Sequence, residues 1–391
     1  MEEQRDLLLM SSDNIVMRIN FDLSIFEVVN ERLLPWTIRG KLRKVISFDE
    51  VKTRYDDTQR QIAIGKNKEA IMSWLANRTL PLSRKNAKWV YNLLKLEQLN
   101  SEYEKAKVAL ECRAVSVIDN YWVKLDGDPV RWKDVNIRHV SLNEIIAQVA
   151  LHGSSLTLQG SLNTPELTTH GAYAKGWKRE NGDLWLYKLG SKDPTESKIE
   201  VMCSKLLDKL PVEHLEYVAG ESMGIYACKC KCMATDNLSI LHGMDFYTYC
   251  NVNGLDANDE MMRIDSESIY KMWIVDYLIS NRDRHGQNWG FYYEPESMTI
   301  LRCHPLYDHN NAFANEYMDN PDAPYQFLDM STREAAKKAI SKVDFYFKEP
   351  ITRGDFMTSK QYESFMSRAN ELGIKVRIAD PLIDAATSAS V

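Results

Sequence analysis

Residues 281–308 constrain the fold of this chain more than any other stretch, and they read NRDRHGQNWGFYYEPESMTILRCHPLYD. An aspartate, Asp283, is followed five positions later by an asparagine, Asn288. A second aspartate, Asp308, comes after a short apolar run typical of a β-hairpin. Before this stretch, apolar residues recur every three or four positions over residues 265–280, which predicts a helix. The packing of that helix would fix the loop that carries the first aspartate.

The residue types of this loop suit the transfer of a phosphoryl group from ATP. A carboxylate can orient an attacking hydroxyl and accept its proton, while an amide oxygen and another carboxylate hold Mg²⁺ against the triphosphate. The Asp-x4-Asn spacing is that of the catalytic loop of protein kinases. On its own the spacing is a weak signal, because Asn, Asp, Arg and Gly are also common between a helix and a strand.

Three segments upstream stand in the order in which kinases build an ATP site. Residues 168–175, TTHGAYAK, can form a strand, a loop and a strand whose backbone N–H groups cradle phosphates, although they lack Gly-x-Gly-x-x-Gly and also suit a plain hairpin turn. An alternating strand that contains Lys188 follows. In the predicted helix 196–210, Glu200 lies beside the buried stripe and could pair with this lysine, and Glu196 is the alternative partner.

The longer motif is more specific than its parts. Asn281-x-Asp283-Arg284-His285-x-x-Asn288, followed by Pro305-Leu306-Tyr307-Asp308, resembles the HipA-like kinases, bacterial serine/threonine kinases whose fold is shared with the phosphatidylinositol kinases. The resemblance covers roughly residues 150–370 on motif order. It implies a two-lobed, protein-kinase-like α+β fold with a β-rich N-lobe and a helical C-lobe. It also implies ATP and Mg²⁺ in the cleft and a Ser or Thr hydroxyl of a protein as acceptor.

By this resemblance, each motif position takes a role. Asp283 would be the general base, and Asn288 and Asp308 would be the metal ligands. Lys188 would bind the phosphates of ATP, with Glu200 as its partner. The phosphate loop and the segment that passes the adenine edge would supply the remaining ATP contacts, through Gly171, Ala172, Lys175, Cys232 and Met233.

Two further motifs allow more than one interpretation. Thr168 and Thr169 directly precede the phosphate loop and are possible autophosphorylation sites, because a phosphate there would repel the triphosphate of ATP; both also suit plain strand positions. The sequence ACKCKC at residues 227–232 could suggest a metal site. Zinc sites use a different cysteine spacing, so we expect a strand that leads into the hinge between the lobes.

Composition narrows the class of protein. With 391 residues, 44% of them hydrophobic and 27% charged, the chain is expected to be globular with two or three domains. The net charge of −6 argues against a direct nucleic-acid partner. No signal peptide and no apolar stretch long enough for a membrane are evident, and seven cysteines favour reduced thiols in the cytoplasm.

We divide the chain into a partly helical N-terminal α/β region (1–130), an N-lobe with the phosphate loop and ATP lysine (131–235), and a helical C-lobe with the catalytic loop and metal site (236–391). The first region does not resemble the N-terminal subdomain of the toxin members, so a toxin role is not indicated. In the first region we expect strands or short helices over 1–60 and helices over 66–111, with a solvated basic start at 83–88. In the N-lobe we expect strands joined by glycine turns over 156–185. In the C-lobe we expect loops over 243–258 and 309–325, helices over 332–347 and 358–372, and a frayed end at 385–391.

Two other functions stay open at this stage. One is a kinase of the same fold that acts on a lipid or a small molecule. The other is an ATP-binding pseudokinase scaffold, which the presence of the acidic and lysine motif positions disfavours. The sequence predicts neither the protein substrate nor the oligomeric state.

Overall fold

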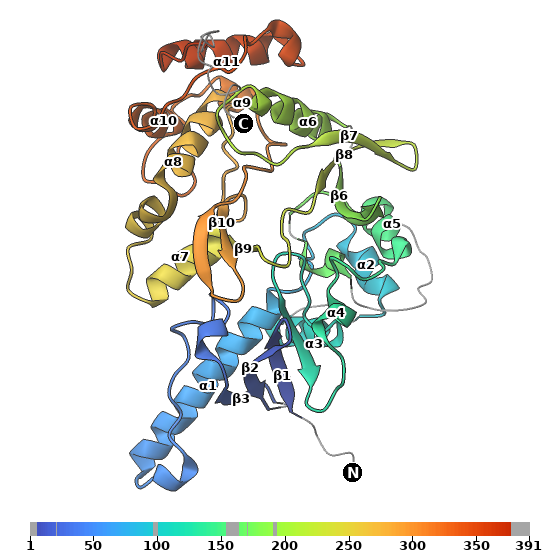
Figure 1. Ribbon diagram of the computed structural model, residues 1–391, viewed down its shortest axis with the longest axis vertical. Helices are drawn as coiled ribbons and strands as arrows, with labels where there is room; N and C mark the ends of the chain where they lie inside the picture. Colours follow the sequence, from blue (N-terminus) through green and yellow to red (C-terminus); the bar gives the residue numbers. More distant parts are fainter. Residues whose placement is uncertain are drawn as a thin grey trace, which may run out of the picture.

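The computed structural model describes residues 6–20, 22–96, 101–153, 164–169, 171–190 and 194–376 (Figure 1). These residues form a mixed α+β fold whose strands make two four-stranded sheets and one three-stranded sheet, all with antiparallel pairing. The N-terminal sheet lies at one end of the molecule, and the C-terminal helix lies at the other (Figure 1). The predicted segment 385–391 lies outside the described residues.

The N-terminal sheet has the strand order β3-β2-β1-β4. Its strands are β1 (Leu7–Ser11), β2 (Asn14–Ile19), β3 (Ile25–Val28) and β4 (Tyr121–Leu125). Strands therefore form in the first part of residues 1–60, and only short 3₁₀ turns, η1 (Glu31–Leu33) and η2 (Phe48–Glu50), precede the first helix. Three helices separate the hairpin strands from β4, namely α1 (Arg54–Ala76), α2 (Ala87–Leu93) and α3 (Glu102–Glu111).

The second sheet has the order β5-β6-β8-β7 and carries two of the predicted ATP residues, Lys175 and Lys188. Helix α6 (Thr195–Asp208) packs against β8 and β7 of this sheet, and its Val201 lies in a buried cluster with Cys228 and Cys230 of β8. The predicted apolar stripe, with Ile199, Cys203 and Leu206, is buried in the large hydrophobic core instead. The other elements of this part are α4 (Trp132–Val135), α5 (Glu144–His152), η3 (Pro165–Thr168), β5 (Lys175–Glu180), β6 (Asp183–Leu189), β7 (Val218–Ser222) and β8 (Ile225–Lys231).

The third sheet, of order β11-β10-β9, packs against α7 and α8. The hairpin predicted after Asn288 is confirmed, since β10 (Gly290–Glu294) pairs with β11 (Thr299–Cys303). Strand β9 (Ser239–His242) pairs with β10 from the other side. The helical elements are α7 (Gly243–Val252), α8 (Ala257–Leu278), α9 (Asn315–Met318), α10 (Thr332–Ile340), η4 (Arg353–Asp355) and α11 (Ser359–Glu371).

The expectation of a loop over residues 243–258 is wrong. Helix α7 occupies most of this segment, because Phe246 and Cys250, four residues apart, are buried against the core. The helix predicted from Asp265 starts earlier, yet Asp265 has non-helical backbone angles inside α8, and its Oδ1 accepts the backbone N–H of Ser268 at 3.1 Å. Asp265 therefore marks a kink that divides α8 into two helical segments, and its side chain caps the second segment.

Three other segments differ from expectation. Residues 164–169 form the 3₁₀ turn η3 in place of a strand, since Pro165 favours a helical start. Within 309–325, His309, Ala312 and Phe313 are buried, so that stretch is not a fully exposed loop. Of the helix predicted over 332–347, only α10 forms, and the following Phe347 contributes to the core from extended backbone.

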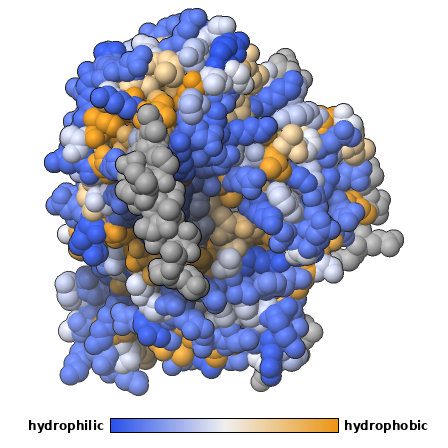
Figure 2. All heavy atoms as spheres, turned by 45° about the horizontal axis from the view of Figure 1, so that its top comes forward, coloured by the Kyte–Doolittle hydropathy of each residue, from blue (hydrophilic) through white to orange (hydrophobic). Residues whose placement is uncertain are grey.

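One large hydrophobic core connects the two ends of the described chain. It includes Leu9 from β1, Trp74 from α1, Leu206 from α6, Trp273 from α8 and Phe365 from α11. Within the described ranges, no helix is both long and apolar enough to cross a membrane. The face shown in Figure 2 is mostly hydrophilic, with apolar side chains gathered in small separate patches.

Replacing two glycines with alanine separates the effect of close packing in a strand from the effect of helix propensity. A Cβ on Gly290 in β10 would lie 2.8 Å from His242 Cα and would also meet the carbonyl oxygen of Leu241 across the β9 pairing. We expect Gly290→Ala to lower the free energy of unfolding by about 1–3 kcal/mol. Gly65, inside α1, has open space around it, and Gly65→Ala should raise that energy by about 0.5–1 kcal/mol. Urea unfolding of both variants measures the contrast, and equal effects would contradict it.

Candidate active site

A cavity of about 160 Å³ lies between the β5-β6-β8-β7 sheet and the loop that follows α8. The predicted ATP residues that line it are Gly171, Lys175, Lys188, Cys232 and Met233, and both predicted metal ligands, Asn288 and Asp308, line it too. Ala172, Glu200 and Asp283 are absent from its walls. Apolar side chains form much of the remaining wall, among them Val117, Ile118, Leu186, Leu215 and Ile240.

Lys188 is the central cation of this cavity. Its Nζ donates to Oε2 of Glu200 at 3.2 Å, to Oδ1 of Asp308 at 2.7 Å and to the hydroxyl of Tyr217 at 2.9 Å. Glu200 is fully buried on α6, at 0% exposure, so it and not Glu196 pairs with the lysine. The pairing predicted from the order of strand and helix is therefore present.

The ionisable side chains of this cluster strongly shift one another's pKa values. Burial opposes the charge of Lys188, but the carboxylates of Asp308 and Glu200 raise its pKa well above the usual value. Burial would also raise the pKa of Asp308, yet the ammonium groups of Lys188 and Lys175 hold it below its usual range. Asp308 is consequently ionised at neutral pH and can serve as a metal ligand.

The backbone at Asp308 is held in an uncommon conformation. Its φ of +62° lies in the left-handed region, which aspartate tolerates better than most residues. The peptide groups on both sides are fixed, because the carbonyl of Tyr307 accepts from Arg284 Nη1 at 2.9 Å and the N–H of His309 donates to Glu200 Oε1 at 2.8 Å. These two contacts stabilise a conformation that turns the Asp308 carboxylate toward Lys188.

A buried ion pair supports the loop that follows α8. Arg284 Nη2 and Nε contact the carboxylate of Asp276 at 2.8 and 3.0 Å, and both side chains are almost fully buried, at 1% and 0% exposure. Arg284 Nη1 also donates to the carbonyl oxygen of Asn288 at 2.7 Å. Asn281 Nδ2 donates to Asp276 Oδ1 at 2.9 Å, and the Tyr325 hydroxyl donates to Oδ2. This network fixes the path of the loop between Asn281 and Asn288.

Asp283 lies beside the cavity and is connected to the phosphate loop. Its Oδ2 accepts a hydrogen bond from Asn311 Nδ2 at 2.6 Å, and Asn311 Oδ1 accepts from the hydroxyl of Tyr173 at 3.3 Å. Asn288 Nδ2 donates to the carbonyl oxygen of Asp283 at 2.7 Å. The amide oxygen of Asn288 is thus the atom that remains to face a metal ion.

The phosphate loop is held by the N-terminal region. Arg84 is buried, and its guanidinium donates to the carbonyl oxygens of Glu166 at 3.2 Å, of Thr169 at 3.0 Å and of Lys175. The backbone N–H of Lys85 donates to the carbonyl oxygen of Ala172 at 2.9 Å. The expectation that residues 83–88 form a solvated helix start is wrong for Arg84, which acts as a clamp on both sides of the loop.

Gly171 and Lys175 face each other across this loop. Gly171 has a φ of +104°, which favours glycine, and an added Cβ there would displace the end of the Lys175 side chain. Burial lowers the pKa of Lys175 to about 8, although the nearby Asp308 carboxylate acts in the opposite direction. The lysine side chain is therefore packed close to the place where phosphates would bind.

The remaining predicted residues occupy the edges of the cavity. Thr168 and Thr169 are buried; the Thr169 hydroxyl donates to the carbonyl of Pro165 at 2.7 Å and accepts from Trp177 Nε1 at 2.7 Å. Cys232 and Met233 follow β8, where the N–H of Cys232 donates to the carbonyl of Leu184 at 2.8 Å. Phosphorylation of either threonine would require this local packing to open.

Sequence reasoning missed several residues of this site, among them Arg84, Tyr173, Tyr217, Asp276, Asn311 and Tyr325. Each acts through a contact between segments distant in the chain, and no local spacing signals such a contact. Asn311 stands three positions after Asp308, and this nearness to the motif is the one signal that could have pointed to it.

Comparisons with known proteins give little further guidance. No protein-family model matches the chain, and no curated protein matches it. The Helicobacter pylori proinflammatory kinase CtkA is similar at 13% identity and a TM-score of 0.36, over 51% of this chain and 89% of that chain. Shewanella oneidensis MR-1 HipA, solved with HipB and operator DNA, is similar at 10% identity and a TM-score of 0.48, over 94% and 98%. Similarity this low carries no argument about function, which rests on the side-chain geometry.

The Arg84 clamp can be tested without any activity assay. Arg84→Ala would leave buried carbonyl oxygens of the phosphate loop without a donor, so we expect the free energy of unfolding to fall by about 2–4 kcal/mol. Faster hydrogen exchange of the loop amides after Thr169 should accompany the loss. The matched control is Lys88→Ala, an exposed cation at the same helix start, with an expected change within about 0.5 kcal/mol. Equal behaviour of the two variants would rule out the clamp.

Proposed function

We propose that this protein is an ATP-dependent protein serine/threonine kinase. The observation that carries the proposal is the bridge from Lys188 to both Glu200 and Asp308, because it joins a strand lysine, a helix glutamate and the predicted metal aspartate in one cavity. Kinases use these groups to hold the phosphates of ATP and the associated metal. A two-lobed kinase arrangement, with residues 131–235 and 236–391 on either side of the cavity, is part of the proposal.

The cavity offers suitable groups for ATP. Its apolar walls near Cys232 and Met233 suit an adenine ring, whereas Lys175 and Lys188 lie where they can neutralise phosphates. The amide oxygen of Asn288 and the carboxylate of Asp308 are hard oxygen ligands of the type that Mg²⁺ prefers. Bound Mg²⁺ would neutralise charge that develops on the β- and γ-phosphates.

In the proposed reaction, the oxygen of an acceptor hydroxyl forms a bond to the γ-phosphorus of ATP, and the bond from that phosphorus to the leaving ADP oxygen breaks. Asp283 accepts the proton of the hydroxyl. Asn311 positions Asp283, since its amide occupies one carboxylate oxygen and leaves the other for the acceptor. Lys188 and Lys175 stabilise negative charge on the phosphate groups.

The three candidate functions predict different products in a radiolabelling experiment. A lipid or small-molecule kinase would use the same cavity, so radiolabel from [γ-³²P]ATP would appear in an organic extract or in the small-molecule fraction of a host lysate. A pseudokinase would bind ATP and transfer none of the label. A protein serine/threonine kinase gives labelled phosphoserine or phosphothreonine after acid hydrolysis. Autophosphorylation at Thr168 or Thr169 stays a prediction, readable by mass spectrometry in the same experiment.

Asp283→Asn tests the proposed base. Transfer of radiolabel to protein should fall by about 10²–10⁴-fold, because the amide cannot accept the proton. The dissociation constant for ATP should stay within about threefold, because Asp283 is outside the nucleotide contacts. Asp259→Asn, an exposed carboxylate in α8, is the matched control and should retain full transfer. Wild-type transfer by Asp283→Asn would remove this residue from the mechanism.

The low pKa of Lys175 predicts a pH dependence of ATP binding. In the free protein Lys175 loses its proton near pH 8, and a bound triphosphate favours the protonated form. ATP affinity should therefore fall as pH rises from about 7 to 9, with proton uptake on binding above pH 8. Calorimetry in two buffers of different ionisation enthalpy measures this uptake. Lys175→Arg keeps the charge and should abolish the dependence; if it does not, Lys175 is not the titrating group.

A further inference from the structure

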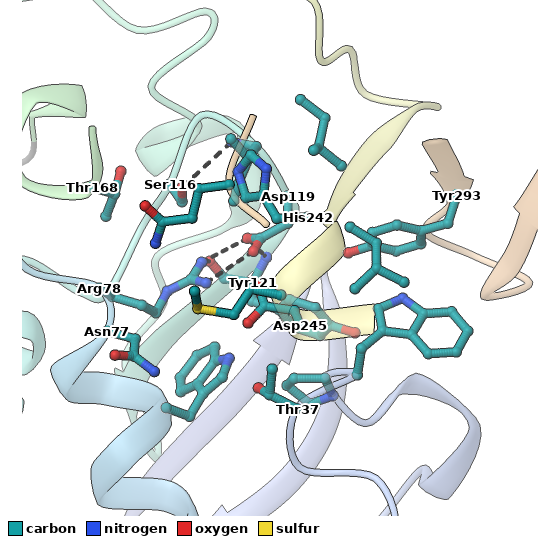
Figure 3. A pocket seen from close by; sticks show the side chains of 18 residues that line it. Thr37, Asn77, Arg78, Ser116, Asp119, Tyr121, Thr168, His242, Asp245 and Tyr293 are labelled. Carbon is teal, nitrogen blue, oxygen red and sulfur yellow. Dashed lines mark hydrogen bonds and ion pairs between the residues drawn. The ribbon is translucent and has the colours of Figure 1, made fainter. Parts of the chain in front are cut away.

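A second cavity, of about 150 Å³, adjoins the first and lies between the N-terminal region and the helical part of the chain (Figure 3). The N-terminal side supplies Trp36, Trp74 near the end of α1, Asn77 and Arg78 just after it, and Asp119. The other side supplies Asp245 at the start of α7 and Tyr293 in β10. None of these side chains has a part in the proposed phosphoryl transfer.

The charges that line this cavity do not cancel. Apart from His242, the lining groups that can carry charge as side chains are Arg78, Asp119 and Asp245. Arg78 pairs with Asp119 through two hydrogen bonds, of 2.9 and 2.6 Å, which Figure 3 shows as dashed lines. Its guanidinium also donates to the carbonyl oxygens of Ala114, at 2.5 Å, and Tyr121, at 3.2 Å. Because Arg78 is used in this way, the cavity offers little to an anion.

Asp245 is left as the uncompensated charge. Its carboxylate has no hydrogen bond or ion pair with other residues in the part of the chain that the structure describes. Burial and the neighbouring Asp119 carboxylate raise the pKa of Asp245 to about 6, against the weaker opposing effects of Lys41 and Arg78. A carboxylate in this position is stabilised by a cation that enters the cavity.

Aromatic rings line the same cavity as this carboxylate. They belong to Trp36, Trp74, Tyr121 and Tyr293, and Figure 3 labels Tyr121 and Tyr293 together with Asp245. The protein already places a cation on two of these rings, since the guanidinium of Arg78 lies 4.5 Å from the ring centroid of Trp74 and that of Arg39 lies 4.4 Å from the ring centroid of Trp36. Ring faces beside a carboxylate form the usual environment for an organic cation.

We propose that this second cavity binds an alkylammonium or guanidinium group, with Asp245 as its counter-ion and the aromatic rings as its walls. The cation can come from a free amine or from a basic side chain of another protein, and the same contacts serve both. A metal ion is disfavoured, because the second carboxylate of the cavity, Asp119, is already occupied by Arg78. The proposal does not depend on the phosphoryl-transfer chemistry.

A cation bound in this cavity would affect the first cavity, because the two cavities share part of their walls. Ile118, Thr168, Ile240, His242 and Gln287 line both cavities. Gln287 belongs to the loop that carries Asp283 and Asn288, and Thr168 immediately precedes the phosphate loop. A bound cation would therefore contact the walls of the proposed nucleotide site from the side of the N-terminal region.

Calorimetric titration at constant ionic strength tests the proposal in the full chain without nucleotide. The probes are n-butylammonium chloride and N-acetyl-arginine methylamide, each compared with a neutral analogue, 1-butanol or N-acetyl-citrulline methylamide. We expect saturable binding of a charged probe that is about tenfold tighter than that of its neutral analogue. Preference for butylammonium indicates a free amine as the natural ligand, and preference for the arginine derivative indicates a basic side chain.

Asp245→Asn should abolish the difference between charged and neutral probes. Its fold should be retained, because the substitution removes a carboxylate whose ionisation is unfavourable in the folded state. Asp57→Asn, an exposed carboxylate of α1, is the matched control and should bind like the original protein. The proposal is overturned if neither cation binds saturably, or if a cation binds Asp245→Asn as tightly as the original protein.

Discussion

The buried contact between Arg284 and Asp276 is the interaction on which the rest of the candidate site depends. It ties the end of α8 to the loop that carries Asp283 and Asn288, and Arg284 also reaches the carbonyl of Tyr307, next to Asp308. The guanidinium of Arg284 therefore fixes the backbone around all three predicted catalytic and metal residues. Burying two charges is costly unless every polar atom finds a partner. Here Asn281 and Tyr325 donate further hydrogen bonds to the carboxylate of Asp276.

The sheet that carries Lys188 also helps to position the candidate site. The Lys188 ammonium contacts both Glu200 of α6 and Asp308, so it connects the two sides of the cavity. In the proposed kinase reaction, this cluster would already hold in place the groups that phosphates and a metal need. The N-terminal region contributes at the same level, through Arg84 and Lys85 on the phosphate loop.

Local sequence was sufficient for some of these features and insufficient for others. A pairing of Lys188 with Glu200 or Glu196 could be predicted from the order of strand and helix, and helix periodicity placed Glu200 beside the buried stripe. The hairpin β10–β11 could be predicted from the short apolar run between Asn288 and Asp308. Helix α7 could not, since its polar and aromatic residues resemble a loop until the core that receives Phe246 is known. Arg84 was taken for a solvated residue because its partners lie 82 to 91 positions further along the chain.

The Arg84 clamp bears on what counts as a folding unit in this protein. A boundary drawn near residue 130 from motifs would separate the guanidinium from the carbonyl oxygens it satisfies, and would cut through a core that contains both Trp74 and Trp273. Residues 131–391 are thus not a separate folding unit to which the first region is merely attached. Any rearrangement of the first region, by a partner or by a change in the chain, would be transmitted directly to the backbone carbonyls of Glu166, Thr169 and Lys175 that Arg84 holds.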